Sequence, residues 1–236
     1  VSADYDLNKQ VSQMESFVAA GVDIIMLNAV DAKAIAPAVK KAQAAGVIVA
    51  AFDVSAPGAD VTVMTNNIKA GEEACQYIVD QIKGKGDVVI INGPASSSII
   101  DRVQGCKNVL TKSPDIKILS DDQNAQGSRD GGMAVMQGLL TRFDKIDAVF
   151  AINDPTAIGA ELAAKQLNRN EFFFTAVDGA PDIEKSLSSG KSMIKASASQ
   201  DPYTMAGDSL TMAVDLLNGK KPAQDTILLD PKLITA

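Results

Sequence analysis

The chain of 236 residues contains no histidine. A serine or cysteine triad of the usual kind needs an imidazole base, and zinc enzymes nearly always use imidazole ligands. The two cysteines are too few to build a cysteine-based structural zinc site. The composition therefore argues against these enzyme classes, and we expect no catalytic residues, no metal site and no cofactor.

Basic clusters and long apolar runs are missing as well. The formal net charge is −7, and the 22 lysines and arginines are scattered, so we expect no nucleic-acid partner. No apolar run approaches the ~20 residues that span a bilayer. No signal peptide is present, and Val1 is not a start methionine, so we expect that something has been removed or left out before it.

The two cysteines, Cys75 and Cys106, each fall within a predicted helix. One interpretation is that both are small buried apolar residues. The other is a disulfide between neighbouring helices in an oxidising compartment. The sequence leaves both interpretations open.

Short β-rich runs alternate with helical periodicity along the chain. Most of the runs are continuously apolar, as expected of strands covered on both faces. The predicted strands are 23–28, 47–52, 61–65, 87–92, 116–120, 148–152, 172–177, 193–197 and 227–230. Two of the intervening amphipathic stretches end at Gly21 and Gly46, which fit left-handed helix C-caps. This rhythm predicts an α/β fold of repeated βαβ units with parallel sheets.

A second series of strands and helices begins after Thr65, and no flexible linker precedes it. Two small α/β domains joined by short strand-like crossovers fit this pattern better than two domains on a tether. The opening VSADYD looks like the end of a strand, and an α/β domain rarely opens halfway through one. We expect that a strand and a helix belong before Val1.

Polar residues stand just past most of the predicted strands. They are Asn28, Asp53, Asn66, Asn67, Asn153, Asp154, Asp178 and Gln200, and the loop GPASSSIIDR carries Arg102 into the next helix. Parallel strands end at one edge of a sheet, where open α/β sheets bind ligands. Carboxylates, amides and a guanidinium suit a neutral polyhydroxylated ligand. For each residue taken alone a helix cap or a turn is the favoured interpretation, and only the convergence of several strand ends favours a ligand site. For Asp154, ahead of Pro155, we expect the helix N-cap.

Phosphate chemistry is a weaker interpretation of the same positions. NGPASSSII is rich in serine but lacks the glycine spacing and lysine of a P-loop and matches no dinucleotide fingerprint. Asp53 lacks the second acidic pair or positioned lysine that a phosphotransfer nucleophile needs. We expect neither nucleotide binding nor phosphotransfer.

A series of motifs runs through essentially the whole chain in a fixed order. They are QVSQMESFVAAGVDIIMLNAVD, AGVIVAAFD, VTVMTNNIKAGE, INGPASSSIIDRVQGCKNVL, AVFAINDPTAIGAELA, FTAVDGAPDIEKSLSSGK and SASQDPYTMAGDSL. In this order they resemble the type I periplasmic sugar-binding proteins of ABC importers, and the ribose-binding group in particular.

The resemblance implies a fold of two doubly wound parallel-sheet lobes joined by three crossovers. The crossovers are expected near 65–66, 200–201 and 230–231. The N-terminal lobe then comprises 1–65 plus 201–230 and is incomplete at its start, and the C-terminal lobe comprises 66–200 plus 231–236.

The resemblance also implies which residues bind the ligand. By the matching motifs they are Arg102, Asn153, Asp178 and Gln200 in the second lobe, and Asp53 with nearby Asn28 in the first. The chain departs from the family pattern at Val54, where many members have arginine, and at 126–128, where many have an aromatic residue. A different pentose, a hexose or a polyol therefore fits these site residues at least as well as ribose does.

The implied function is that of a periplasmic solute-binding receptor, not an enzyme. It binds a monosaccharide or polyol in the cleft between the lobes, closes by a hinge motion and engages the membrane permease of an ABC importer. The intact protein is expected to be a monomer. The chain as given could associate through its incomplete lobe, and we expect it to bind sugar weakly or not at all. The alternative is the effector-binding core of a LacI-type transcription repressor, which shares the fold.

Overall fold

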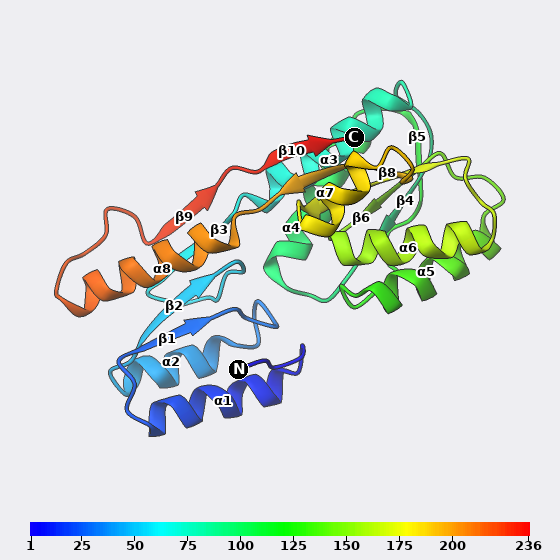
Figure 1. The fold of residues 1–236 in the computed structure, drawn as a ribbon. Coiled ribbons are helices and arrows are strands. Elements are labelled where there is room, and N and C mark those ends of the chain that lie inside the picture. The colour runs from blue at the N-terminus through cyan, green and yellow to red at the C-terminus, as the bar shows by residue number, and fades with distance from the viewer. The chain divides into compact units, whose positions relative to one another are not determined.

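Two mainly parallel sheets organise the computed structural model, which describes all 236 residues. The chain divides into two units, and each holds one sheet with helices on both faces (Figure 1). Unit 1 comprises Val1–Asn66, Ala95–Ser98 and Asp201–Leu229, and unit 2 comprises Asn67–Pro94, Ile99–Gln200 and Asp230–Ala236. The predicted α/β class with parallel sheets is confirmed.

Unit 1 contains a four-stranded parallel sheet in the order β1-β2-β3-β9. Its elements are α1 (Leu7–Ala19), β1 (Ile24–Leu27), α2 (Ala36–Ala44), β2 (Ile48–Phe52), β3 (Val61–Thr65), α8 (Pro202–Leu217) and β9 (Thr226–Leu229). Helix α1 begins where the Asp6 side chain accepts a hydrogen bond from the Lys9 N–H. Helices α1 and α2 end before Gly21 and Gly46, which have φ values of 73° and 84° and therefore serve as the predicted left-handed caps.

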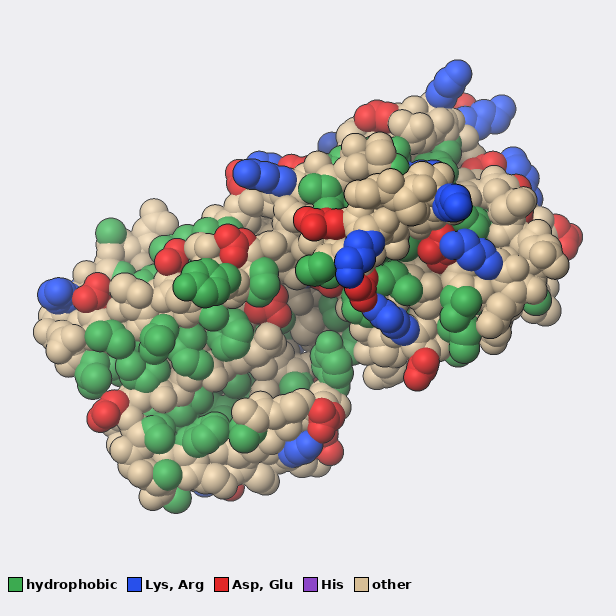
Figure 2. Space-filling view, in the orientation of Figure 1, with side chains coloured by type: hydrophobic (Ala, Val, Ile, Leu, Met, Phe, Trp, Pro, Cys, Tyr) green, Lys and Arg blue, Asp and Glu red, His purple; other side chains and the backbone are tan.

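The two faces of the unit 1 sheet are covered unequally. On β1, Ile25 and Leu27 are buried against α1 and α2, whereas Ile24 and Met26 on the opposite face are only partly buried. Helix α8 covers that opposite face and packs mainly on β2 and β3. Helix α8 exposes further large apolar side chains, among them Leu210, Val214 and Leu217. Figure 2 shows hydrophobic side chains gathered over this part of unit 1.

Unit 2 contains a six-stranded sheet in the order β10-β8-β7-β6-β4-β5. Its elements are α3 (Asn67–Gln81), β4 (Lys85–Ile91), α4 (Ser97–Leu110), β5 (Asp115–Ser120), α5 (Arg129–Arg142), β6 (Ala148–Ala151), α6 (Asp154–Gln166), β7 (Phe173–Asp178), α7 (Pro181–Ser188), β8 (Ile194–Ser199) and β10 (Lys232–Thr235). All neighbours are parallel except β10, which pairs antiparallel with β8 and which the sequence analysis did not predict. One face of the sheet packs on α5, α6 and α7, and the other on α3 and α4.

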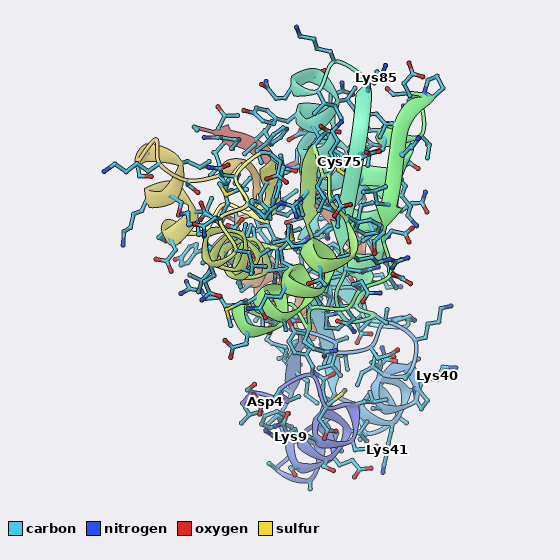
Figure 3. All side chains as sticks on the ribbon, turned by 90° about the vertical axis from the view of Figure 1, so that its right-hand side faces the viewer. Asp4, Lys9, Lys40, Lys41, Cys75 and Lys85 are labelled. Carbon is cyan, nitrogen blue, oxygen red and sulfur yellow. A yellow bond between two sulfur atoms is a disulfide. The ribbon has the colours of Figure 1, made fainter.

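Helices α3 and α4 approach each other at two glycines. A Cβ atom on Gly71 would lie 2.0 Å from the Arg102 carbonyl oxygen, and one on Gly105 would lie 2.0 Å from that of Ile68. A side chain at either position would therefore push the helices apart. Beside this crossing, Cys75 and Cys106 form a disulfide with a Cα–Cα distance of 5.0 Å, and Cys75 is labelled in Figure 3. Of the two interpretations left open by the sequence, the structure contains the disulfide.

None of the helices combines the length and the hydropathy that crossing a membrane requires.

Removing the disulfide is expected to destabilise the protein. The bond closes a loop with a sequence separation of 31, for which the chain-entropy model gives roughly 3 to 4 kcal/mol. We expect the double variant Cys75→Ala/Cys106→Ala to lose about this much free energy of unfolding in urea titrations. Reduced wild-type protein serves as the control and should match the double variant. Two free thiols per chain in native, unreduced protein would contradict the assignment.

Association through unit 1 stays a prediction. The partner that we expect to bind there is a second copy of the chain. Partly covered apolar faces on a sheet and on α8 favour association, since large exposed patches commonly mark interfaces. Sedimentation velocity over a range of concentrations should show a monomer–dimer equilibrium that Leu210→Glu/Val214→Glu shifts to monomer. A wild-type protein that stays monomeric at all concentrations would refute this prediction.

Candidate functional site

The polar residues of unit 2 meet where parallel strands end. Asp178 is the last residue of β7, Gln200 directly follows β8, and the Ile152 carbonyl directly follows β6. Helix α4 brings Arg102 to the same place, because its close crossing with α3 leaves Arg102 beside Asn67. We call Arg102, Asn67, Asp178 and Gln200 the Arg102 cluster.

The Arg102 guanidinium holds this cluster together. Its Nη1 donates to the Ile152 carbonyl oxygen at 2.8 Å and lies 3.3 Å from Asp178 Oδ1, and its Nε donates to Asn67 Oδ1 at 3.0 Å. The side chain is only 5% exposed, so its charge depends on these partners. These hydrogen bonds join helix α4 to two strand ends. Because Arg102 is buried, losing one of the partners would leave its positive charge partly unpaired.

Gln200 is tied to the same carboxylate. Its Nε2 donates to Asp178 Oδ1 at 2.7 Å, and its backbone N–H donates to the Asp178 carbonyl oxygen at 2.9 Å. Three of the residues predicted for the second lobe, Arg102, Asp178 and Gln200, are therefore in direct contact. A single carboxylate oxygen accepts hydrogen bonds from two of them.

The structure corrects the role expected of one of the two adjacent polar residues after β6. The prediction that Asp154 caps α6 is wrong, because Asn153 is the N-cap and its Oδ1 accepts from the Thr156 N–H at 3.0 Å. Asn153 Nδ2 also donates to the Gly127 carbonyl oxygen at 3.0 Å. Asn153 is half-buried at the same strand ends, where its proposed ligand contact stays a prediction.

Asp154 is instead fully buried and binds the turn after β7. Its Oδ1 accepts from Ser197 Oγ at 2.7 Å and its Oδ2 from the Ala180 N–H at 2.7 Å. Burial and repulsion from Asp178 raise the pKa of Asp154 to about 7, although the two hydrogen bonds and Arg102 favour its ionised form. The carboxyl group therefore titrates near neutral pH.

The predicted residues of unit 1 also lie together. Asn28 Nδ2 donates to Asp53 Oδ2 at 2.9 Å. Asp53 has φ 66°, a left-handed conformation that aspartate tolerates better than most residues. The turn after β1 is shaped by Gln10, which donates to the Asn28 carbonyl oxygen and accepts from the Val30 N–H.

Sequence reasoning missed the supporting roles of three residues, Gln10, Asn67 and Asp154. Gln10 gives no signal because it sits within an amphipathic helix among other polar residues. Asn67 was noted as a residue past a strand end, but its contact with Arg102 depends on how α3 and α4 cross. Asp154 had a visible signal, since it stands beside Asn153 just past a strand, but local rules favoured the cap.

The chemistry of the Arg102 cluster favours a neutral ligand with several hydroxyl groups. The Arg102 cation is already balanced by the Asp178 anion, so the pair offers no net positive charge to a carboxylate or phosphate. The carboxylate accepts hydroxyl protons, the amides donate and accept, and the guanidinium donates only.

Residues 1–221 match the family model described as the periplasmic binding protein domain. The chain belongs to this family. It is 34% identical over 238 residues to the ribose import binding protein RbsB of Bacillus subtilis, a match that covers 100% of the chain and 76% of the relative. It is 30% identical over 236 residues to the xylitol-binding protein of Mycolicibacterium smegmatis, covering 98% of the chain and 67% of the relative.

Solved structures of this family agree with the fold. The periplasmic binding protein component of the arabinose ABC transporter from Shewanella sp. ANA-3, bound to L-arabinofuranose, superposes with a TM-score of 0.90. The two sequences are 26% identical, and the match covers 97% of this chain and 78% of the other. The predicted membership of the type I periplasmic binding proteins is confirmed.

The ionisation of Asp154 should make the stability of the protein depend on pH. The folded state binds this proton more tightly than the unfolded chain, because the pKa rises from 3.8 to about 7. Stability is therefore lost as the pH rises from 3.8 to about 7, by at most on the order of 4 kcal/mol, and levels off above that range. We expect Asp154→Asn to lack this fall when unfolding by urea is measured across the range. Asp215→Asn, which neutralises an exposed carboxylate on α8, is the control, and parallel pH curves for wild type and Asp154→Asn would refute the assignment.

Proposed function

We propose that this protein is the solute-binding receptor of an ABC importer for a monosaccharide or polyol. The observation that carries the proposal is the Arg102 cluster, in which a charge-balanced guanidinium and carboxylate meet two amides at the ends of parallel strands. Such a set of groups suits vicinal hydroxyls, since one carboxylate can accept two of their hydrogen bonds. Family membership gives independent support.

The relatives narrow the class of ligand without identifying it. Those named above are called binding proteins for ribose and xylitol, and the solved structure holds L-arabinofuranose. All three ligands are small neutral polyhydroxylated molecules, which agrees with the balanced charge of Arg102 and Asp178. We propose that Arg102, Asn153, Asp178 and Gln200 in unit 2 bind the ligand, with Asp53 and Asn28 in unit 1.

Ligand-driven closure follows from the same proposal. The resemblance implies that one ligand engages residues of both units and that the units then close as lobes about the crossovers. A ligand favours a closed state only through contacts that the open state lacks. Asp53 on one unit and Arg102 with Asp178 on the other would supply those contacts to the form that a permease recognises.

The disulfide supports a location outside the cytoplasm. Disulfides persist in oxidising compartments such as the bacterial periplasm and are rare in the cytosol. The Cys75–Cys106 bond therefore favours a periplasmic receptor over the alternative of a LacI-type repressor core, which acts on DNA. The relatives give the repressor alternative no support, and the absence of histidine favours binding over catalysis.

Removing the Asp178 carboxylate should abolish sugar binding. We expect D-ribose, xylitol or L-arabinose at high millimolar concentration to raise the melting temperature of the full-length wild-type protein, because a ligand that binds only the folded state stabilises it. The Asp178→Ala variant should show no sugar-induced shift in the same assay. Asp178→Asn, which preserves the shape of the side chain, should keep a reduced shift.

The control is Asp215→Ala, which removes an exposed carboxylate from α8 and should retain the full shift. An undiminished shift in Asp178→Ala would overturn the assignment of Asp178. If no sugar or polyol stabilises the full-length protein, the proposed function itself is wrong.

A further inference from the structure

We infer that Asp154 is a positioning residue that holds the ligand-binding side chain of Asp178 in place, and that this role depends on its ionisation. The effect on ligand binding rests on the proposed function. The contacts that hold Asp178 in place do not depend on any ligand. It assigns to Asp154 a role other than capping α6, since Asn153 is the cap.

The backbone at Asp178 adopts a conformation that needs support. Asp178 has φ 133°, which non-glycine residues rarely adopt and which costs on the order of 1 to 3 kcal/mol. Gly179 follows with φ 65°, and a Cβ atom there would lie 2.6 Å from that of Ser199. Such a conformation persists only where neighbouring contacts over-determine it.

Asp154 supplies those contacts through the two residues that follow Asp178. The Ala180 N–H donates directly to Asp154 Oδ2 at 2.7 Å. The Gly179 N–H donates to Ser197 Oγ at 3.1 Å, and Ser197 in turn donates to Asp154 Oδ1 at 2.7 Å. Both N–H groups of the turn are therefore fixed by a single carboxylate, one directly and one through a hydroxyl.

The charged groups that face Asp154 are the members of the ligand-binding pair. Asp178 from β7 repels it and Arg102 from α4 attracts it. The Ser197 hydroxyl of β8 and the N–H of Ala180, the residue before α7, both donate to it. Arg129 of α5 pairs with Asp182 instead. Burial and Asp178 outweigh Arg102 and the hydrogen bonds, so the pKa of Asp154 rises to about 7.

Protonation of Asp154 would change this network. An ionised carboxylate accepts from both Ser197 and Ala180, as the structure shows. A protonated carboxyl must itself donate a proton, which reverses the hydrogen bond to Ser197 and weakens the acceptor for the Ala180 N–H. The turn is then held less firmly, and Asp178 loses its fixed position for ligand hydroxyls.

The structural part can be tested without ligand. Amide resonances of Gly179 and Ala180 in the labelled wild-type chain, followed by NMR from about pH 5 to about pH 9, should titrate with a midpoint near 7. In Asp154→Asn these resonances should not titrate. Asp147→Asn is the matched control, because Asp147 likewise accepts a backbone N–H, from Asp87, but at the other end of β6. In Asp147→Asn the Gly179 and Ala180 resonances should titrate as in the wild type.

The functional part uses D-ribose as the probe in calorimetry. Wild-type affinity should fall by up to about tenfold for each pH unit below the midpoint, and Asp147→Asn should follow it. Asp154→Asn should bind with a pH-independent affinity close to that of wild type at the acidic end. An Asp154→Glu variant in which D-ribose affinity again depends on pH would support the positioning role over a purely structural one.

The outcomes distinguish this inference from the proposed function. Identical amide titrations in wild type and Asp154→Asn, or identical pH profiles of D-ribose affinity, would overturn the positioning role even if sugar binds. Amides that titrate only when Asp154 is present would support the role even if no sugar or polyol binds, and the proposed function would then fail alone. If Asp154→Asn does not fold, Ser197→Ala replaces it and should diminish the titration of Gly179.

Discussion

The buried guanidinium of Arg102 is the constraint on which the candidate site of unit 2 depends. A cation that is 5% exposed cannot be solvated, so the fold has to bring partners to it. These partners come from the start of α3, the end of β6 and the end of β7. Two glycines let α3 and α4 approach closely enough for the first contact, and the disulfide joins the same two helices. The cluster is therefore a product of helix packing as much as of strand order.

The arrangement of the fold could be predicted because its signals are local. Continuous apolar runs gave the strands of both sheets, and Gly21 and Gly46 marked helix ends through their positive φ values. Strand β10 escaped prediction because it is short, only partly buried and antiparallel in an otherwise parallel sheet. Its partner β8 lies far away in sequence, so no hairpin signal marks the pairing.

The candidate site could be predicted only in part. Residues past strand ends were found, since parallel strands direct them to one edge, and Arg102, Asp178 and Gln200 are in contact. The helix cap was assigned to Asp154 and belongs to Asn153, because either residue fits the local rules for a cap before Pro155. What decided between them was the distant Ser197 and the turn at Ala180, which only the tertiary structure brings near.

The pairing of β3 with β9 has a consequence for how the chain folds. Thr62 pairs with Thr226, so nearly all of unit 2 lies in the loop between these two strands. Unit 2 consists mainly of consecutive elements, whereas the sheet of unit 1 closes only once its last strand has arrived. Loop-closure entropy and high contact order therefore make the completion of unit 1 a late and slow event. A nascent chain would carry the open sheet edge of β3 throughout that interval.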